Sequence, residues 1–428
     1  MSELLKQVRV LDPSSQTDRI ADVLIIDGIV TAVEDAIADY PSNATVYESS
    51  GLILAPGLVD LYSHSSEPGF EERETLNSLM QAAAAGGFTR VAILPDTAPA
   101  LDSLASIAWL HDQSKALSSS PSVPLLQPWA ALTIEVEGQK ITELAELATA
   151  NIAGFADGKP LQSIMVRRLL EYLHPFGKPI MLWAWDQELA GNGVMREGLD
   201  SIQIGLPGIP AIAETAALAA LLECIEAIGT PVHLMRISTA RGVELIRNAK
   251  ERGLPITAST SWMHLLLNTQ MIASYDPNLR LNPPLGTPAD QAALIDAVQQ
   301  GVIDAIAIDH SPYTYEEKTV PFAEAPPGAI GLELALPLIW HRFVESGLWT
   351  AIELWSALST RPAQCLNQKT PTIAINPSGT QANDQPAEMI LFDPQQRWIA
   401  KPESLKSFAS NTPWLNQEIQ GQVIKTWC

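Results

Sequence analysis

The feature that most constrains the fold of this chain is an alternation of short apolar runs with helical stretches through its middle. Each run ends in a polar cluster, and a stretch with helical periodicity follows, which is typical of strand–helix units in a parallel sheet. Eight repeats of this unit favour a closed (β/α)8 barrel of the TIM type. The eight apolar runs are residues 58–61, 90–94, 125–131, 152–155, 179–183, 232–234, 255–258 and 305–308.

An open, doubly wound sheet is the alternative to a barrel. Such a sheet would favour a Gly-x-Gly-x-x-Gly turn after an early strand, and none is present here. The first helical stretch, residues 74–85, is rich in alanine and is followed by Gly86-Gly87, a helix stop. The same reasoning predicts helices over residues 161–173, 211–228, 241–250 and 289–299.

The two chain ends have the character of short strands. Residues 8–11 and 21–26 are apolar, and Asp27-Gly28 is a hairpin turn signal. Residues 388–392 and 421–427 are similar. We therefore predict a small β-sandwich-like domain from residues 1–54 and 386–428, a barrel over residues 55–366, and a linker over residues 367–385.

Composition limits the classes of partner that the chain is expected to bind and the cellular compartment in which we expect it. The formal net charge of −22 opposes binding to nucleic acid and to anionic membranes. No apolar run reaches the roughly 18 residues of a membrane span, and the N-terminus lacks a signal-peptide core. The three cysteines fit neither a disulfide framework nor a zinc motif. We expect a cytoplasmic protein.

The end of the first barrel strand carries the strongest motif. It reads Asp60-Leu61-Tyr62-Ser63-His64, and Glu67-Pro68-Gly69 follows. This stretch resembles the dihydroorotase signature of the amidohydrolase superfamily, in which an apolar strand ends in Asp-Leu-His-x-His. Further blocks appear in the family's order, and together they are specific. They are Gly86-Gly87-Phe88-Thr89, Leu94-Pro95-Asp96-Thr97, Gly205-Leu206-Pro207-Gly208, Ile237-Ser238-Thr239-Ala240, Leu281-Asn282-Pro283-Pro284 and Ile308-Asp309-His310-Ser311-Pro312.

The resemblance implies a barrel that interconverts dihydroorotate and N-carbamoyl-L-aspartate in pyrimidine biosynthesis. In that family zinc activates a water molecule, and an aspartate after the eighth strand acts as general acid and base; here that residue is Asp309. Ligand-type residues are retained at His64, Asp157 and Asp309. The chemistry needs imidazole and carboxylate ligands at one end of the barrel, with a position open to water.

Three positions at which the family has metal-binding imidazoles are replaced. Tyr62 stands for the first histidine of the strand-one pair, Trp183 for the strand-five histidine, and Arg236 for the strand-six histidine. An indole has no lone pair for a metal, and a guanidinium stays protonated. We therefore expect zinc to bind weakly or not at all.

The family's substrate contacts are also altered. The arginine that would clamp the substrate carboxylate is Ser66, and the asparagine after the second strand is Asp96. The histidine that ends the strand-eight motif is Tyr313, whereas Asn282 is retained. Because a bidentate arginine clamp is hard to replace, we expect substrate binding to be impaired.

Arg236 suggests a substitute for the metal. Without zinc, Asp157 and Asp309 would be buried carboxylates without a counterion, which is costly. We therefore hypothesise that the guanidinium pairs with one or both of them. Other conspicuous residues have structural interpretations: His233 as a hydrogen-bonded barrel histidine, His310 as a brace for the strand-eight loop, and Trp183, Trp185 and Trp262 as space-filling groups or a stacking platform.

Two functions of different classes follow. The first is a dihydroorotase-like protein with little or no activity that serves as a structural or regulatory partner of aspartate carbamoyltransferase. The second is an active metal-dependent hydrolase of a cyclic amide, such as dihydroorotate, a hydantoin or allantoin. An inactive protein that senses a ligand in the retained pocket is a third possibility that the residues do not separate from the first. We expect a homo-oligomer in either case.

Overall fold

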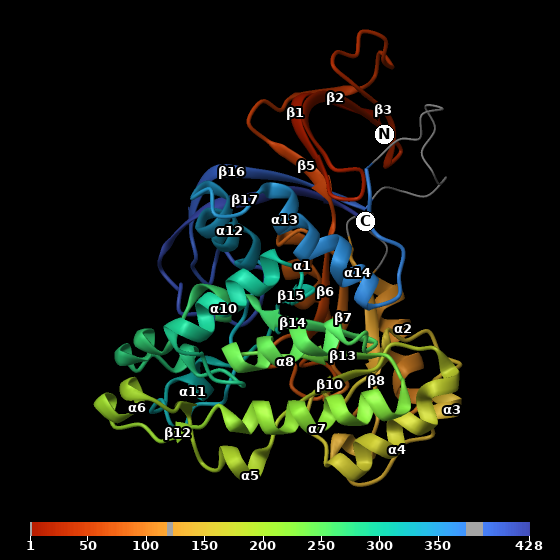
Figure 1. The fold of residues 1–428 in the computed structure, drawn as a ribbon. Coiled ribbons are helices and arrows are strands. Elements are labelled where there is room, and N and C mark those ends of the chain that lie inside the picture. Colours follow the sequence, from red (N-terminus) through yellow and green to blue (C-terminus); the bar gives the residue numbers. More distant parts are fainter. Residues whose placement is uncertain (1, 118–122, 374–387) are drawn as a thin grey trace.

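The structure, a computed structural model, describes residues 2–117, 123–373 and 388–428. A barrel of strands surrounded by helices carries a sheet domain at one end, and both chain ends lie in that domain (Figure 1). The fold predicted from the sequence is therefore confirmed.

Eight parallel strands form the barrel. They pair in chain order, and a parallel bridge from Phe155 to Ile180 joins the two halves. The ring closes where the Asp309 amide donates to the Tyr62 carbonyl at 3.1 Å and the His64 amide to the His310 carbonyl at 2.8 Å. Each of the eight expected runs overlaps one observed strand. These are β6 (Leu58–Ser63), β7 (Phe88–Ile93), β8 (Leu125–Ala130), β9 (Gly154–Phe155), β10 (Met181–Trp183), β13 (Val232–Met235), β14 (Ile256–Ser261) and β15 (Ala305–Ala307).

The first helix lies where the sequence pattern indicates it. Helix α1 (Leu76–Ala85) begins after Thr75, whose hydroxyl accepts a hydrogen bond from the Ser78 amide, and it ends at Gly86. Its buried side chains face the barrel, as expected for an amphipathic helix. The other long helices are α2 (Leu104–Leu117), α4 (Ser163–Leu173), α7 (Ile212–Ile228), α8 (Ala240–Glu251) and α10 (Pro288–Gln299).

Shorter elements fill the connections, and several follow the carboxyl ends of barrel strands. Those after β10 are α5 (Gln187–Ala190), β11 (Met195–Arg196), α6 (Leu199–Ile204) and β12 (Gly208–Ile209). Those after β14 and β15 are α9 (Trp262–Leu266), η3 (Thr269–Ser274), η4 (Pro277–Leu279) and α11 (Tyr315–Lys318). The remainder are η1 (Ile134–Val136), α3 (Leu144–Leu147), η2 (His174–Phe176), α12 (Ala335–Ile339), η5 (Trp340–Glu345), α13 (Ala351–Trp355), η6 (Ser356–Thr360) and α14 (Arg361–Cys365).

The chain ends form one seven-stranded sheet, whereas we expected a sandwich-like domain. Strand β5 pairs with β1 on one side and with β16 on the other, so its hydrogen bonds connect the N-terminal and C-terminal strands into a single sheet. Most of the expected linker, residues 374–385, lies outside the described residues. The strands are β1 (Ser2–Asp12), β2 (Thr17–Ile26), β3 (Ile29–Glu34), β4 (Thr45–Glu48), β5 (Ile53–Pro56), β16 (Met389–Ile399) and β17 (Glu418–Trp427).

The segment between β16 and β17 returns to the barrel and contacts the loop after β15. The Asn411 side chain donates to the Ser311 carbonyl at 2.9 Å and accepts from the Tyr313 amide at 3.0 Å. The indole of Trp414 stacks on that of Trp262, with ring centroids 5.0 Å apart. The C-terminal segment therefore helps to shape the carboxyl-end face of the barrel. Among the described residues, no helix is long and apolar enough to cross a membrane.

Candidate active-site region at the mouth of the barrel

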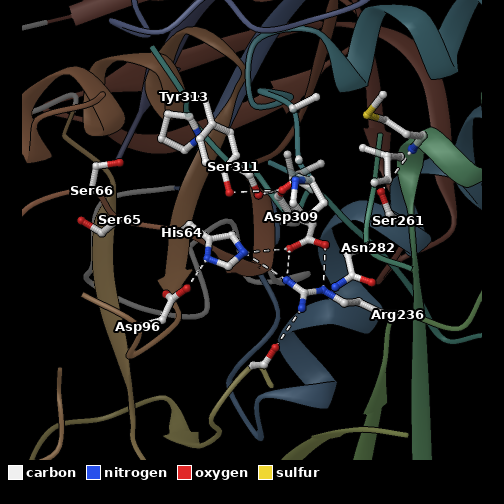
Figure 2. Close-up of a pocket in the computed structure, with 18 of the residues that line it drawn as sticks. His64, Ser65, Ser66, Asp96, Arg236, Ser261, Asn282, Asp309, Ser311 and Tyr313 are labelled. Carbon is white, nitrogen blue, oxygen red and sulfur yellow. Dashed lines mark hydrogen bonds and ion pairs between the residues drawn. The ribbon is translucent and has the colours of Figure 1, made fainter. Parts of the chain in front are cut away.

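A cavity of about 230 Å³ opens at the carboxyl ends of the barrel strands. This is the face on which barrel enzymes build their active sites. Of the ten positions singled out from the sequence, eight line this cavity, and Tyr62 and Asp157 do not. Figure 2 shows the polar side chains that meet there. The eight are His64, Ser66, Asp96, Trp183, Arg236, Asn282, Asp309 and Tyr313.

The dominant contact in the cavity is a bidentate ion pair between Arg236 and Asp309 (Figure 2). Arg236 Nε donates to Asp309 Oδ2 at 2.8 Å, and Arg236 Nη2 donates to Asp309 Oδ1 at 2.6 Å. Arg236 Nη1 donates to the Gly158 carbonyl at 2.9 Å. The guanidinium also lies 5.1 Å from the ring centroid of Trp183. Hydrogen bonds and an aromatic face thus compensate the buried cation.

The backbone positions both partners of this ion pair in the same unusual way. Arg236 has a φ of 60° and Asp309 a φ of 53°, so both occupy the left-handed region within two residues of the end of a barrel strand. Non-glycine residues adopt this region at a cost on the order of 1 kcal/mol. The Tyr62 hydroxyl accepts a hydrogen bond from the Arg236 amide at 3.2 Å. Tyr62 therefore supports the turn that carries Arg236.

His64 extends the ion pair into a network of four charged groups. Its Nδ1 lies 2.7 Å from Asp96 Oδ2, and its Nε2 lies 3.5 Å from Asp309 Oδ1 and 3.0 Å from Arg236 Nη2. A guanidinium can only donate, so the contact with Arg236 is a hydrogen bond only when Nε2 carries no proton. The two carboxylates favour the opposite state, the imidazolium, which gives two cations and two anions.

The pKa shifts follow from this arrangement. Burial alone would lower the pKa of His64, but the carboxylates of Asp96 and Asp309 raise it to about 9. Burial opposes ionisation of Asp309, yet Arg236 and His64 hold its pKa well below the usual range. The pKa of Asp96 is likewise lowered against burial by His64. At neutral pH the network is therefore fully charged and balanced.

The three retained ligand-type residues do not all meet at one point of the cavity. Both Asp309 oxygens accept from Arg236, and Asp157 lies in a different set of contacts. Its carboxylate accepts from the Leu132 and Thr133 amides at 2.7 and 3.1 Å and from the Thr133 hydroxyl at 2.5 Å. Across the part of the chain that the structure describes, no three His, Cys, Asp or Glu side chains converge as ligands.

These contacts correct one expectation from the sequence and agree with another. Asp157 does not join His64 and Asp309, because its oxygens satisfy the loop after β8. The hypothesis that Arg236 pairs with one or both aspartates holds for Asp309, whereas its third contact is the Gly158 carbonyl. The residues present therefore do not fit the zinc centre that the resemblance implies.

The altered substrate positions are mostly engaged within the protein. Asp96 is bound to His64, and the Tyr313 hydroxyl donates to the Pro327 carbonyl at 3.2 Å. Ser66 and Asn282 also line the cavity; Figure 2 shows Ser66 away from the ion pair and Asn282 beside Arg236. The guanidinium of Arg73, which the sequence did not single out, lies 5.0 Å from the Tyr313 ring centroid and pairs with Glu317.

Behind the cavity, a buried pair braces the strand-eight loop. His310 Nε2 lies 3.0 Å from Glu74 Oε2, and its Nδ1 accepts from the Gly331 amide at 3.1 Å. Glu74 also accepts from the Ser407 hydroxyl at 2.6 Å and the Phe408 amide at 2.8 Å. Sequence reasoning missed Glu74 because its partners lie far away in the chain. The bracing role considered for His310 agrees with these contacts.

His233 is a structural residue inside the barrel. Its Nδ1 lies 2.9 Å from the Thr257 hydroxyl and its Nε2 lies 2.8 Å from the Ser259 hydroxyl. Burial lowers the pKa of His233 to about 3, so the imidazole is neutral. Ser259 in turn contacts the Tyr62 hydroxyl at 3.3 Å. His233 is therefore a hydrogen-bonded histidine inside the barrel, as the sequence suggested.

Replacement of Arg236 by Met is expected to lower the free energy of unfolding by about 3–5 kcal/mol, because Asp309 would remain buried without its counterion. Chemical denaturation would measure the loss. Adding Asp309→Leu should restore part of it. Arg241→Met, which removes an exposed ion pair with Glu244, is the control and should change stability little. Equal effects of the two arginine substitutions would contradict the structural role of Arg236.

The His64 imidazole is expected to titrate near pH 9 in NMR spectra of its ring protons. Asp96→Asn should lower this pKa, whereas Asp18→Asn in the sheet domain should not. Because the folded pKa lies above the unfolded value of 6.5, the stabilisation is fully present below pH 6.5 and is lost as the pH rises through 9. Thermal unfolding against pH checks this. Titration of His64 at or below 6.5 would refute it.

Comparisons with known proteins agree with this architecture. Residues 51–242 match the model of the family described as dihydro-orotase-like. A probable dihydroorotase-like protein of Synechocystis sp. is 45% identical, with 98% of each chain covered. A dihydroorotase of Geobacter sp. is 36% identical over 100% of this chain and 97% of that protein.

Solved structures show the same fold at low identity. L-hydantoinase from Arthrobacter aurescens superposes with a TM-score of 0.80 at 19% identity, covering 99% of this chain and 94% of that chain. A D-hydantoinase gives a TM-score of 0.79 at 17% identity, covering 100% and 94%. With relatives this similar along its whole length, the chain belongs to the dihydroorotase-like family of amidohydrolases.

Proposed function

We propose that this chain is a dihydroorotase-like protein with little or no hydrolytic activity, which acts as a structural or regulatory partner of aspartate carbamoyltransferase. The observation that carries the first part is the bidentate ion pair between Arg236 and Asp309 at the mouth of the barrel. It joins a permanent cation to the residue that the family uses for proton transfer.

Proton transfer by Asp309 would be hindered in this arrangement. A general base must have a free oxygen within hydrogen-bond reach of the proton that it removes. Both Asp309 oxygens accept hydrogen bonds from Arg236, and the cation holds the pKa of Asp309 well below its usual range. A carboxylate of such low basicity is a poor acceptor for a proton from water. Both ring nitrogens of His64 face carboxylates, Nδ1 that of Asp96 and Nε2 that of Asp309.

Recognition of an anionic substrate would be impaired as well. Ser66 stands where a carboxylate-clamping arginine would stand, and Asp96 adds a negative charge to the cavity wall. The Arg236 guanidinium is neutralised by Asp309 and donates three hydrogen bonds within the protein. A substrate carboxylate would therefore have to compete with Asp309 for its counterion.

The partner role is supported by what the chain preserves. The barrel, the sheet domain and the braces around the strand-eight loop are intact, although the positions for metal and substrate are altered. A complete fold around an altered metal and substrate site suits a protein that acts by binding a partner through its surface. We further propose a cytoplasmic homo-oligomer.

An active cyclic-amide hydrolase is the second candidate, because a cavity of about 230 Å³ remains open beside the ion pair. That cavity would also serve the third possibility, a ligand sensor. The structural similarity to hydantoinases lies below 25% identity and concerns the fold alone. The enzymatic candidate differs from the two non-enzymatic ones in turnover, so an activity assay separates it from them.

Purified protein should contain far less than one zinc per chain and should show no detectable hydrolysis of dihydroorotate, a hydantoin or allantoin after incubation with zinc. Elemental analysis and a coupled ultraviolet assay would measure both quantities. A catalytically competent dihydroorotase treated in parallel is the control for metal loading. Near-stoichiometric zinc together with turnover would overturn the proposal and establish the second candidate.

A further inference from the structure

Two short helical segments at an outer corner of the barrel pack against each other. They are α6 (Leu199–Ile204), from the connection after β10, and η3 (Thr269–Ser274), from the connection after β14. The Tyr275 hydroxyl donates to the Ile204 carbonyl at 2.6 Å, and the Thr269 hydroxyl donates to Asp200. Helix α6 lies away from the sheet domain (Figure 1). The two segments therefore form one connected structural unit.

This unit leaves large apolar side chains in solvent. Leu199 is 71% exposed and Ile202 is 78% exposed, and as residues three apart they lie on the same side of α6. Met271 is 46% exposed and Tyr275 is 48% exposed. Single exposed apolar residues are ordinary, but four on two packed segments suggest an interaction site. We call these four residues the α6–η3 surface.

The charged residues within the two segments that carry the α6–η3 surface are all acidic. Residues 197–206 and 269–276 contain the acids Glu197, Asp200 and Asp276 and no lysine or arginine. The whole chain carries a net charge of −22. A second copy placed here would bring acidic groups against acidic groups, which is unfavourable. The complementary partner has apolar side chains surrounded by basic ones.

We infer that the α6–η3 surface docks a protein partner whose contact face is apolar with a rim of lysine and arginine. This inference rests on the proposed function, because it names the surface through which a structural partner would be bound. Apolar burial would supply the affinity, and the opposite charges would accelerate association and give it a dependence on salt.

The test is binding of the full-length chain to purified aspartate carbamoyltransferase from the same organism, measured by isothermal titration calorimetry and sedimentation velocity. The double substitution Leu199→Ser/Ile202→Ser should weaken binding at least about tenfold, as loss of a central apolar contact does. Glu197→Lys should also weaken binding and reduce its dependence on salt. Ile164→Ser, on the exposed face of α4, is the matched control and should have no effect.

Three results would overturn the inference. If the double variant binds as tightly as the unmodified chain, the partner uses another surface, and the proposed function stands. If the unmodified chain does not bind the transferase, the partner named in the proposed function falls together with this surface. If the double substitution changes self-association instead, the occupant is a second copy. Leu199, Ile202 and Glu197 are all exposed, so thermal unfolding should confirm that each variant is folded.

Discussion

The ion pair between Arg236 and Asp309 is the interaction on which the rest of the site depends. It joins the ends of β13 and β15 across the mouth of the barrel, through two residues with left-handed backbone conformations. Neighbouring groups contact it: the Tyr62 hydroxyl accepts from the Arg236 amide, and His64 with Asp96 adds a second pair of charges. The resulting network is neutral as a whole, which is what burial of four charges requires.

A guanidinium and a metal ion compensate a buried carboxylate in different ways. A metal ion supplies a positive charge that accepts lone pairs, whereas a guanidinium supplies a positive charge that donates hydrogen bonds. Both compensate a buried carboxylate, so the fold tolerates the exchange. Only the metal can activate a water molecule, which is why the function proposed for this barrel includes little or no hydrolysis.

The strands could be predicted from the sequence because their apolar periodicity is local, and the positions of His64, Arg236 and Asp309 follow from motifs at strand ends. The direction of Asp157 could not be predicted, since a carboxylate there can face the cavity or cap the loop that carries Thr133, and hydrogen-bond geometry decides. Glu74 and Asn411 were missed because they act on partners far along the chain, from segments without a recognisable motif.

The central claim is that Arg236 occupies the place of a metal, and a crystal structure of the protein grown with excess zinc tests it most directly. Data collected on both sides of the zinc absorption edge would locate any bound ion. The account predicts an intact pair between Arg236 and Asp309 and no anomalous peak beside His64. A zinc peak between His64 and Asp309, with Arg236 displaced from the cavity, would contradict it.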